Sequence, residues 1–507
     1  MTASGNVYCG ARAQRFLGDS TRRFGRRAHP VRPPADTDTA PQAIRQARLL
    51  LGEVMTAQFI ARDVQRKSVR TVSQMPSTVL SSVPQAREDF EYDVAIVGLG
   101  YVGLPTALAH HASGGRILGF DVSGQRLADI KQRSVDLLPS DHERLAAALA
   151  SEDLQLSTDP ADLAKAKSVI VCVPTPIDAH QVPDLSILAS ASRTVVEQAV
   201  RGQLIVMTST TYAGCTRDMV AEPLIGRGLV PGVDVQVAFS PERINPGVAD
   251  FTIEDTPRVV GGYSTSCREA AVQVLASYTG SVHRTSSMEV AEMTKLLENT
   301  FRAVNIAMAN EFAEACRALN LPVHEVIDSA ATKPFGFMPF TPGPGVGGHC
   351  IPCDPHYLLW QLRRHNVNLP VVSSAMEGIE GRPAQAVARC AEVLSHHGKG
   401  LGGARILVVG LAYKPDVADL RESPSLKIIA RLAAAGAKVS YVDAHFPQGV
   451  DIEGAKYQAV ADPAAYNADL VLLHTRHADA DLSWISEQTP VVDATYRAEE
   501  LAHRVLL

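Results

Sequence analysis

Short apolar runs alternate with segments of helical period along most of the chain, beginning near residue 91. The first run is "VAIV", residues 94–97, and the second is "RILGF", which ends at residue 120. Further runs follow in "SVIVCVPTP", "QLIVMTSTT", "VQVAFSPER" and "PRVVGGYS". Buried parallel strands form continuous apolar runs of this kind, and helical segments between them cover the sheet. The pattern predicts a doubly wound α/β domain over residues 91–287.

A second unit of the same kind lies at the end of the chain. Its first strand is predicted at residues 405–409, and "AKVSYVDA", "DLVLLHTRH" and "PVVDATY" supply later strands. We therefore expect a second Rossmann-like domain with a parallel sheet over residues 399–507. The loop after its first strand carries Lys414 and Arg421 but has an incomplete glycine pattern. A phosphate-bearing ligand other than a dinucleotide therefore stays open.

Residues 288–319 contain neither glycine nor proline and keep an apolar helical period. They predict one long helix that joins the two sheet domains, within a central helical domain over residues 288–398. Lys295, Asn299 and Arg302 lie at i, i+4 and i+7, so they share one face of this helix. The spacing alone fits a solvated stripe as well as a row of side chains lining a cleft.

The balance of basic and acidic residues differs between the first 90 residues and the remainder of the chain. Residues 1–90 carry 14 Lys and Arg against 7 Asp and Glu and have no sustained period, which predicts a disordered basic leader. Three interpretations of it stay open: a dispensable or misassigned extension, an organellar transit peptide, and an arm that binds nucleic acid or an acidic partner.

The remainder of the chain is acidic, with 34 Lys and Arg against 47 Asp and Glu. This part gives no reason to expect nucleic-acid binding. It contains no apolar run of about 18 residues, so we expect no membrane span. The eight cysteines of the whole chain are sparse, as expected for reduced thiols in a cytoplasmic enzyme.

A glycine motif follows the first predicted strand. Gly98, Gly100 and Gly103 form G-x-G-x-x-G, with Tyr101 and Val102 between the last two. In a βαβ unit such glycines give a tight turn, close approach of the backbone to a pyrophosphate, and close packing of helix on strand. The motif predicts a dinucleotide site.

Asp121 ends the second predicted strand, where a carboxylate would bond the ribose hydroxyls and repel a 2′-phosphate. This favours NAD over NADP, although Arg126 nearby leaves NADP open. Ligands of such sheets sit at the carboxyl ends of the strands. The polar residues expected there are Thr175, Thr210, Glu242 and Arg243.

The loop "PFTPGPGVGGHCIPCDP" ends in two cysteines, Cys350 and Cys353. A zinc site is disfavoured because His349 and these thiols supply only three ligands, and a thioredoxin-like centre lacks its usual context. The remaining hypothesis is one catalytic thiolate. A nearby lysine, the glycine amides or a helix N-terminus are expected to lower its pKa.

Several long motifs together resemble the UDP-glucose/GDP-mannose dehydrogenase family, and within it the UDP-N-acetylglucosamine and UDP-N-acetylmannosamine 6-dehydrogenases. They include "VAIVGLGYVGLP", "VPTPIDAHQVPDLS", "SPERINPG", "AEMTKLLENTFRAVNIAMANE", "GGHCIPCDPHYLLW" and "GLAYKPDVADLRESPS". The resemblance covers about residues 91–500. It implies oxidation of a UDP-sugar C6 alcohol to the acid with two NAD⁺, in an enzyme of polysaccharide biosynthesis.

The resemblance also assigns catalytic roles. Cys350 is expected to form a thiohemiacetal and then a thioester, and Lys295 to stabilise the oxyanion beside Asn299. Asp354 is expected to transfer protons or position water. Glu242 and Thr210 are expected to orient the hydrolytic water.

Binding roles follow from the same resemblance. The cofactor set is expected to comprise Gly98, Gly100, Tyr101, Val102, Gly103, Asp121, Arg126, Thr175, Thr210 and Arg421. The substrate set is expected to comprise Glu242, Arg243, Lys295, Asn299, Arg302, Gly345, Gly347, Gly348 and Lys414. Residues 399–507 are expected to bind UDP, and the central helix to form a homodimer.

Two positions depart from the family pattern. Cys353 stands where the nearest subgroup usually has an aliphatic residue, and Pro415 replaces a frequent second lysine. UDP-glucose 6-dehydrogenase therefore stays open as the alternative activity. A catalytically silent NAD-binding regulatory protein is the remote alternative, and it has no use for Cys350. Oxidation to a Cys350–Cys353 disulfide stays open as a further hypothesis.

Overall fold

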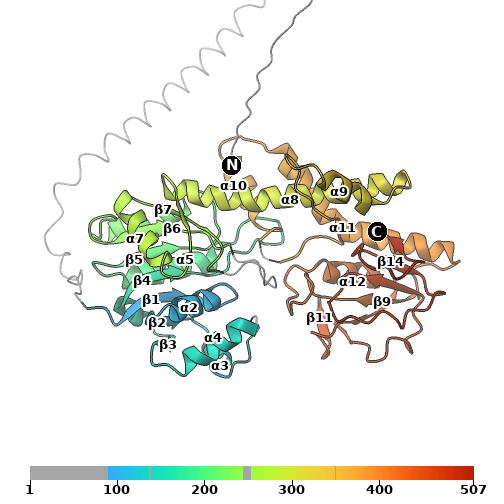
Figure 1. Cartoon of the computed structure of the whole chain (residues 1–507), viewed down its shortest axis with the longest axis horizontal. Helices are drawn as coiled ribbons and strands as arrows, with labels where there is room; N and C mark the ends of the chain where they lie inside the picture. The colour runs from blue at the N-terminus through green and yellow to red at the C-terminus, as the bar shows by residue number, and fades with distance from the viewer. Residues whose placement is uncertain (1–88, 136, 138, 244–252, 349) are drawn as a thin grey trace, which may run out of the picture. The chain divides into compact units, whose positions relative to one another are not determined.

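The computed structural model describes residues 89–135, 137, 139–243, 253–348 and 350–507. Residues 1–88, and with them nearly all of the predicted leader, lie outside this part. The first sheet has eight strands in the order β3-β2-β1-β4-β5-β6-β7-β8 (Figure 1). The strands are β1 (Tyr92–Val97), β2 (Ile117–Phe120), β3 (Leu154–Ser157), β4 (Ala166–Val171), β5 (Leu204–Met207), β6 (Gln236–Phe239), β7 (Arg258–Gly262) and β8 (Val282–Arg284).

The register brings the carboxyl ends of the central strands to one edge. Val97 pairs with Phe120 on one side and with Val171 on the other, and Val171 pairs in turn with Met207. The predicted parallel, doubly wound sheet is confirmed from β3 to β6. It is wrong for β7, which runs antiparallel to β6. An apolar run indicates that a strand is buried but not its direction.

Helices cover both faces of this sheet, and a separate apolar core lies under each face. The glycine-motif helix is α2 (Gly103–Ala112). The others are α3 (Gly124–Lys131), α4 (Pro139–Leu149), α5 (Ser186–Gln198), α6 (Glu222–Gly226) and α7 (Thr265–Leu275), with a 3₁₀ helix at Pro160–Lys165 and a π-helix at Arg217–Ala221.

The predicted long helix is confirmed as α8 (Met288–Ala318). It begins where the Ser287 hydroxyl accepts a hydrogen bond from the Val290 amide. Its first turns belong to the core of the first sheet, and Cys316 near its end belongs to the core of the second. One helix therefore contributes to both cores. It packs against α10 (Asp354–Arg363) and α11 (Pro370–His396), and α9 (Val323–Ala331) follows it.

The second sheet has five strands in the order β10-β9-β13-β14-β15, all parallel. This confirms the second predicted Rossmann-like domain. Its elements are β9 (Arg405–Val409), α12 (Pro424–Ala434), β10 (Lys438–Val442), β13 (Leu470–Leu473), β14 (Val491–Asp493) and β15 (Val505–Leu506), with a hairpin of β11 (Val450–Ile452) and β12 (Ala455–Tyr457). In the described part of the chain, no helix is long and apolar enough to cross a membrane.

Candidate active site

The glycine motif forms a tight turn between β1 and α2. Gly98 has a φ of +88°, and a Cβ added there would lie 2.8 Å from the Cys172 carbonyl oxygen. A Cβ on Gly103 would lie 1.8 Å from the Gly98 carbonyl oxygen, so only glycine lets helix and strand approach this closely. A Cβ on Gly100 would meet nothing within 4 Å. The open side of Gly100 is where a pyrophosphate could approach the backbone.

Asp121 lies directly beside this turn. Its two carboxylate oxygens accept the amide protons of Leu99 and Ser123, each at 2.9 Å. The Arg126 Nε donates to the Leu99 carbonyl at 2.8 Å. Both predicted side chains therefore brace the glycine turn, and the Asp121 carboxylate is partly exposed beside it.

Thr175 and Thr210 follow the carboxyl ends of β4 and β5, and both are partly buried. Thr175 lies beside the Tyr357 hydroxyl of α10. Ser209, a residue that sequence reasoning missed, helps to link these two strand ends. The Ser209 hydroxyl accepts from the Val173 amide at 3.0 Å and donates to the Val173 carbonyl at 2.8 Å.

Lys295 and Asn299 on α8 are buried together with Asp354, the first residue of α10. The Asn299 amide donates to the Asp354 carboxylate. Burial raises the pKa of Asp354 to about 6, while Lys295 and Asn299 act to lower it. The solvated-stripe interpretation is therefore wrong for Lys295 and Asn299. Arg302, two turns beyond Lys295, is exposed.

Cys350 is exposed at the end of its loop, next to this cluster. Desolvation by the surrounding protein raises the pKa of its thiol to about 11, and the Asp354 carboxylate adds to this shift. Lys295 and Arg421 oppose the shift without cancelling it. The expected lowering of the thiol pKa is therefore wrong, because desolvation and a neighbouring carboxylate outweigh two cations. The thiol must give up its proton during the reaction.

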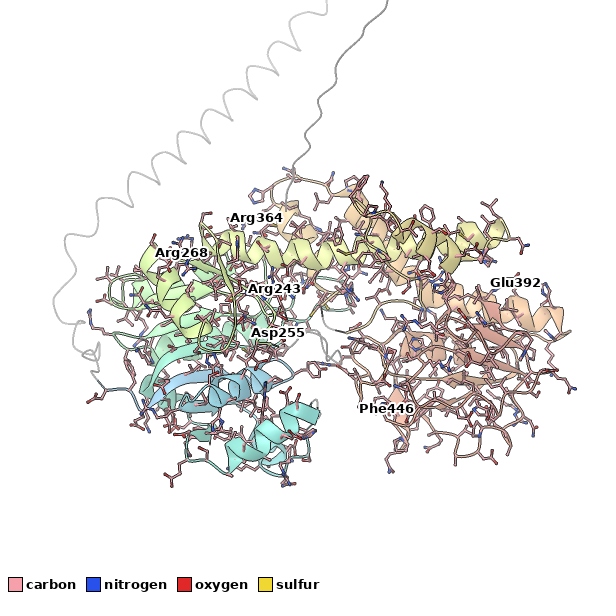
Figure 2. The ribbon with its side chains drawn as sticks, viewed as in Figure 1. Arg243, Asp255, Arg268, Arg364, Glu392 and Phe446 are labelled. Atoms are coloured by element: carbon pink, nitrogen blue, oxygen red, sulfur yellow. The ribbon has the colours of Figure 1, made fainter. Side chains whose placement is uncertain are left out.

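Glu242 and Arg243 follow β6. Arg258, which is 2 % exposed, donates to the Glu242 carboxylate at 2.5 Å. Desolvation would lower the pKa of this guanidinium, but Glu242 raises the pKa above its usual value. Arg243, labelled in Figure 2, forms an ion pair with Glu298 on α8. These ion pairs connect the end of β6 with β7 and α8.

Arg302 of α8 and Lys414 of the loop after β9 lie close enough for their charges to interact. Burial lowers the pKa of Lys414, and the Arg302 guanidinium lowers it further. An arginine of the same loop as Lys414 reaches the glycine motif, since the Arg421 guanidinium carbon lies 5.3 Å from the centroid of the Tyr101 ring. Asp419 accepts from Arg421 Nε at 2.9 Å and holds it in place. Concentrated positive charge of this kind suits a diphosphate.

The glycines before Cys350 pack tightly against the second Rossmann-like domain. A Cβ on Gly345 would lie 2.8 Å from the Pro424 ring, and one on Gly347 would lie 2.5 Å from the Tyr413 Cβ. Gly348 has a φ of +79°, and its amide donates to the Arg421 carbonyl at 2.9 Å. Their shared structural role is to let the loop meet residues 413–424. Among the described residues, which exclude His349, no group of three or more His, Cys, Asp or Glu is placed to hold a metal ion.

Glu292 is a buried carboxylate that sequence reasoning missed, one turn before Lys295 on the same helix. It accepts the Gly214 amide at 2.5 Å, the Thr216 amide at 2.9 Å and the Thr216 hydroxyl at 2.7 Å. Burial raises its pKa to about 7, and these hydrogen bonds oppose the shift. The signal in the sequence is its position on the buried face, at i−3 from Lys295 and i−7 from Asn299. Glu292 fixes the loop after β5, which carries Thr210.

Glu292→Gln is expected to reduce the pH dependence of stability. Because the folded pKa lies above the usual value of 4.5, the contribution of Glu292 to stability is present below pH 4.5 and lost as the pH rises through 7. A shift from 4.5 to about 7 corresponds to about 3 kcal/mol. Between pH 5 and pH 8, the free energy of unfolding measured in urea should therefore fall by about 2–3 kcal/mol more in the wild type than in the variant. Glu392→Gln, in the pair with Arg389 on α11, is the matched control and should lose as much as the wild type. Equal losses in the wild type and Glu292→Gln would contradict this.

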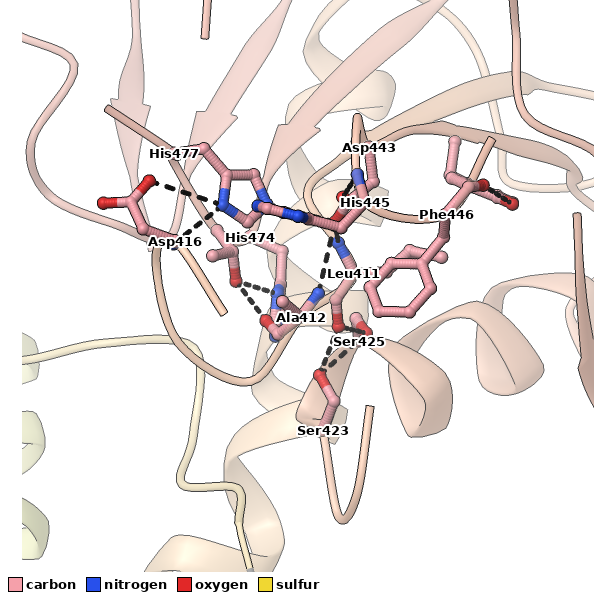
Figure 3. Close-up of polar contacts among 12 residues, drawn as sticks. Leu411, Ala412, Asp416, Ser423, Ser425, Asp443, His445, Phe446, His474 and His477 are labelled. Carbon is pink, nitrogen blue, oxygen red and sulfur yellow. Dashed lines mark hydrogen bonds and ion pairs between the residues drawn. The ribbon is translucent and has the colours of Figure 1, made fainter. Parts of the chain in front are cut away.

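The loop after β9 in the second sheet has a turn like the glycine turn after β1, but its polar contacts differ. Gly410 begins the loop after β9, and the Leu411 amide donates to Asp443 at 2.6 Å, as the Leu99 amide donates to Asp121. In the second sheet, however, His477 Nε2 lies 3.2 Å from the Asp443 carboxylate. The His477 Nδ1 accepts a hydrogen bond from the Asp416 amide at 2.9 Å (Figure 3). The side chain of Asp443 is buried. The carboxylate of this second turn is therefore paired with a side chain of the protein.

Comparison with known proteins agrees with this architecture. Three models of the UDP-glucose/GDP-mannose dehydrogenase family match, namely its NAD binding domain over residues 92–279, its central domain over 289–378 and its UDP binding domain over 407–496. A UDP-N-acetyl-D-mannosamine dehydrogenase of Pyrococcus horikoshii is 36 % identical over 66 % of this chain and 79 % of its own. A UDP-N-acetyl-D-glucosamine 6-dehydrogenase of Pseudomonas aeruginosa is 33 % identical over 69 % and 82 %.

Solved structures give the same result. The structure of the UDP-D-ManNAc dehydrogenase of Pyrococcus horikoshii matches with a TM-score of 0.74 at 32 % identity, covering 82 % of this chain and 98 % of that one. A nucleotide-sugar dehydrogenase is thus the class that fold and site define. The chain belongs to the UDP-glucose/GDP-mannose dehydrogenase family, and it is an NAD-dependent enzyme.

Proposed function

We propose that the protein oxidises the C6 alcohol of a UDP-N-acetylhexosamine to the carboxylate, in two two-electron steps joined by a covalent intermediate on Cys350. The observation that carries the proposal is the cluster of Cys350, Lys295, Asn299 and Asp354 at one point between α8 and α10. The acetamido sugar is supported by the names of the two relatives above. UDP-glucose is the alternative substrate.

The residues around the glycine turn suit NAD. Gly100 is open to a pyrophosphate, Asp121 faces a ribose position, and Tyr101 with Arg421 borders the same space. Val102 precedes the start of α2, whose N-terminal amides favour an anion. When bound, NAD⁺ supplies the hydride acceptor for each oxidation.

Cys350 acts on the aldehyde made in the first oxidation. Its sulfur adds to the carbonyl carbon, and the proton of the thiol is passed to the former carbonyl oxygen, giving a thiohemiacetal. Oxidation of that adduct gives a thioester, and water then displaces the sulfur to release the acid and restore the thiol. The covalent bond keeps the aldehyde in the site between the two oxidations.

Lys295 and Asn299 provide charge and hydrogen bonding at the reacting oxygen. An ammonium group and an amide that are already fixed by burial stabilise an oxyanion without reorganising. Asp354, with a pKa of about 6, is ionised at neutral pH and can accept the proton that the thiol or water gives up. Glu242 and Thr210, at the ends of β6 and β5, are proposed to orient that water.

The substrate is proposed to span from the cysteine loop to the second Rossmann-like domain. Arg302 and Lys414 are proposed to supply positive charge for the diphosphate, since they lie close enough for the charge of Arg302 to act on Lys414. Gly345, Gly347 and Gly348 bring the loop close enough to residues 413–424 to border the same ligand. Arg243 is proposed to contact the sugar from the end of β6.

The stoichiometry of oxidation tests this function. The purified protein is given NAD⁺ with UDP-N-acetylglucosamine, UDP-N-acetylmannosamine or UDP-glucose, and NADH and acid are both counted. We expect two NADH for each acid formed, with an acetamido sugar oxidised fastest. One NADH per product, or no oxidation of any UDP-sugar, would overturn the proposal, and a clear preference for UDP-glucose would favour the alternative.

The protein is further proposed to act as a homodimer through α8. Half-exposed apolar side chains recur along one stripe of this helix: Val290, Met293, Leu297, Phe301, Met308 and Phe312. An apolar stripe of this length on a helix is suited to pack on its own copy about a two-fold axis. The resemblance to the family implies the same interface.

Phe312→Glu is expected to shift the protein from dimer to monomer. A carboxylate placed on both copies of the stripe would be buried without a partner. Light scattering after size exclusion should give twice the 54.2 kDa chain mass for the wild type and the single mass for the variant. Val233→Glu, at a position 77 % exposed outside α8, should stay dimeric. A wild-type monomer would refute the interface.

A cytoplasmic role in making activated uronic acids for polysaccharide biosynthesis is part of the proposal. The supporting observation is chemical: all seven cysteines in the described residues are free, as expected in a reducing compartment.

A further inference from the structure

Cys350 and Cys353 occupy a single turn that leads into α10. The Cys350 carbonyl accepts the Cys353 amide at 3.3 Å and the Asp354 amide at 2.8 Å. A turn closed by an i to i+3 hydrogen bond holds the outer Cα atoms within about 7 Å of each other. A disulfide spans about 4.4–6.8 Å between Cα atoms. The backbone therefore already holds the two cysteines at a separation that a disulfide can bridge.

The two thiols differ in their access to solvent. Cys350 is exposed, whereas Cys353 is 2 % exposed. The residue after Cys350, Ile351, is buried among Met376 and Ile379 of α11 and anchors the turn. A dissolved oxidant therefore reaches Cys350 first, with the buried thiol nearby. Because the pKa of the Cys350 thiol is raised to about 11, only a small thiolate fraction reacts at neutral pH, and the oxidation is expected to be slow.

We propose that Cys353 is a resolving thiol that converts oxidised Cys350 into a reversible intramolecular disulfide. A hydroperoxide transfers one oxygen to the Cys350 sulfur, giving a sulfenic acid and the corresponding alcohol or water. The Cys353 sulfur then attacks the Cys350 sulfur, the S–O bond breaks, and water leaves with the proton of Cys353. A dithiol reductant reverses the disulfide by exchange.

This reaction gives the buried Cys353 thiol a chemical role. Without a resolving thiol, a sulfenic acid is exposed to further oxidation to sulfinic and sulfonic acids, which dithiols do not reduce. The disulfide halts the enzyme but preserves its nucleophile. That consequence rests on the proposed catalytic role of Cys350, whereas the disulfide itself does not.

Mass spectrometry after peroxide treatment tests the inference independently of enzyme activity. Wild type and Cys353→Val are treated with hydrogen peroxide, digested without reduction, and the peptide containing residue 350 is weighed. We expect the wild-type peptide to lose two hydrogen masses and to recover them with dithiothreitol. The Cys353→Val peptide should instead gain two or three oxygen atoms at Cys350, irreversibly. Cys316→Ala, at a buried cysteine of α8, should behave as the wild type.

Three outcomes would overturn the inference. They are sulfinic or sulfonic acid at Cys350 in the wild type without the disulfide, a reversible product in Cys353→Val equal to that in the wild type, and no change at Cys350 under peroxide that oxidises a free model thiol. Failure of the NADH stoichiometry with a disulfide formed as expected would refute the proposed function alone.

Discussion

Cys350→Ala is expected to abolish acid formation, lowering kcat on the order of 10⁴-fold or more. Alanine cannot form the sulfur–carbon bond that holds the aldehyde, so the second oxidation loses its substrate. Because Cys350 is exposed, the change leaves no cavity in the core. Thermal unfolding should therefore stay near that of the wild type. NADH and acid are measured together over a panel of UDP-sugars.

Cys316→Ala is the control for removal of a cysteine elsewhere. It is expected to keep two NADH per acid, since Cys316 lies in the core shared by α8 and the second sheet. Acid formation by Cys350→Ala at a rate within about tenfold of the wild type would contradict covalent catalysis.

Lys295→Met is expected to lower kcat by about 10²–10³-fold, the usual effect of removing one oxyanion donor. Methionine keeps the length and the packing of the buried stem while removing the charge. A second expected effect comes from the charge of Lys295 rather than from its packing. Lys295 lowers the pKa of Asp354, so its removal should move that pKa upward from about 6. The acidic limb of the pH–rate profile should move to higher pH with it.

Lys131→Met, at an exposed lysine of α3, is the matched control and should match the wild type in rate and pH profile. A purely structural role for Lys295 would reduce the amount of folded enzyme but leave the pH profile in place. A lower rate with an unmoved acidic limb would therefore contradict the assigned coupling of Lys295 to Asp354.

Much of the fold follows from patterns that are local in the chain. The runs at 94–97 and 405–409 predict β1 and β9, because parallel strands are buried on both faces. The absence of glycine and proline from 288 to 319 predicts α8. The antiparallel direction of β7 and the β11–β12 hairpin could not be found in this way, since both depend on how the chain returns after a strand rather than on its composition.

In the active site too, features with a local signal in the sequence could be predicted, and features that depend on distant segments could not. Glycine spacing and Asp121 predict the turn, and the helical period places Lys295 with Asn299. The sequence could not show that desolvation raises the Cys350 pKa to about 11, because desolvation depends on the whole surrounding fold. For the same reason the pairs of Glu242 with Arg258 and of Asp443 with His477 were missed. Each joins segments that are distant in sequence.

Peptide mass spectrometry of the enzyme quenched with acid during turnover is the most direct test of covalent oxidation at Cys350. The protein is mixed with NAD⁺ and the UDP-sugar that it oxidises fastest, quenched at successive times and digested. The expected result is a transient acyl adduct of the sugar nucleotide on the peptide that contains Cys350, absent from Cys350→Ala. Formation of acid with two NADH while that peptide stays unmodified and free aldehyde accumulates in solution would contradict it.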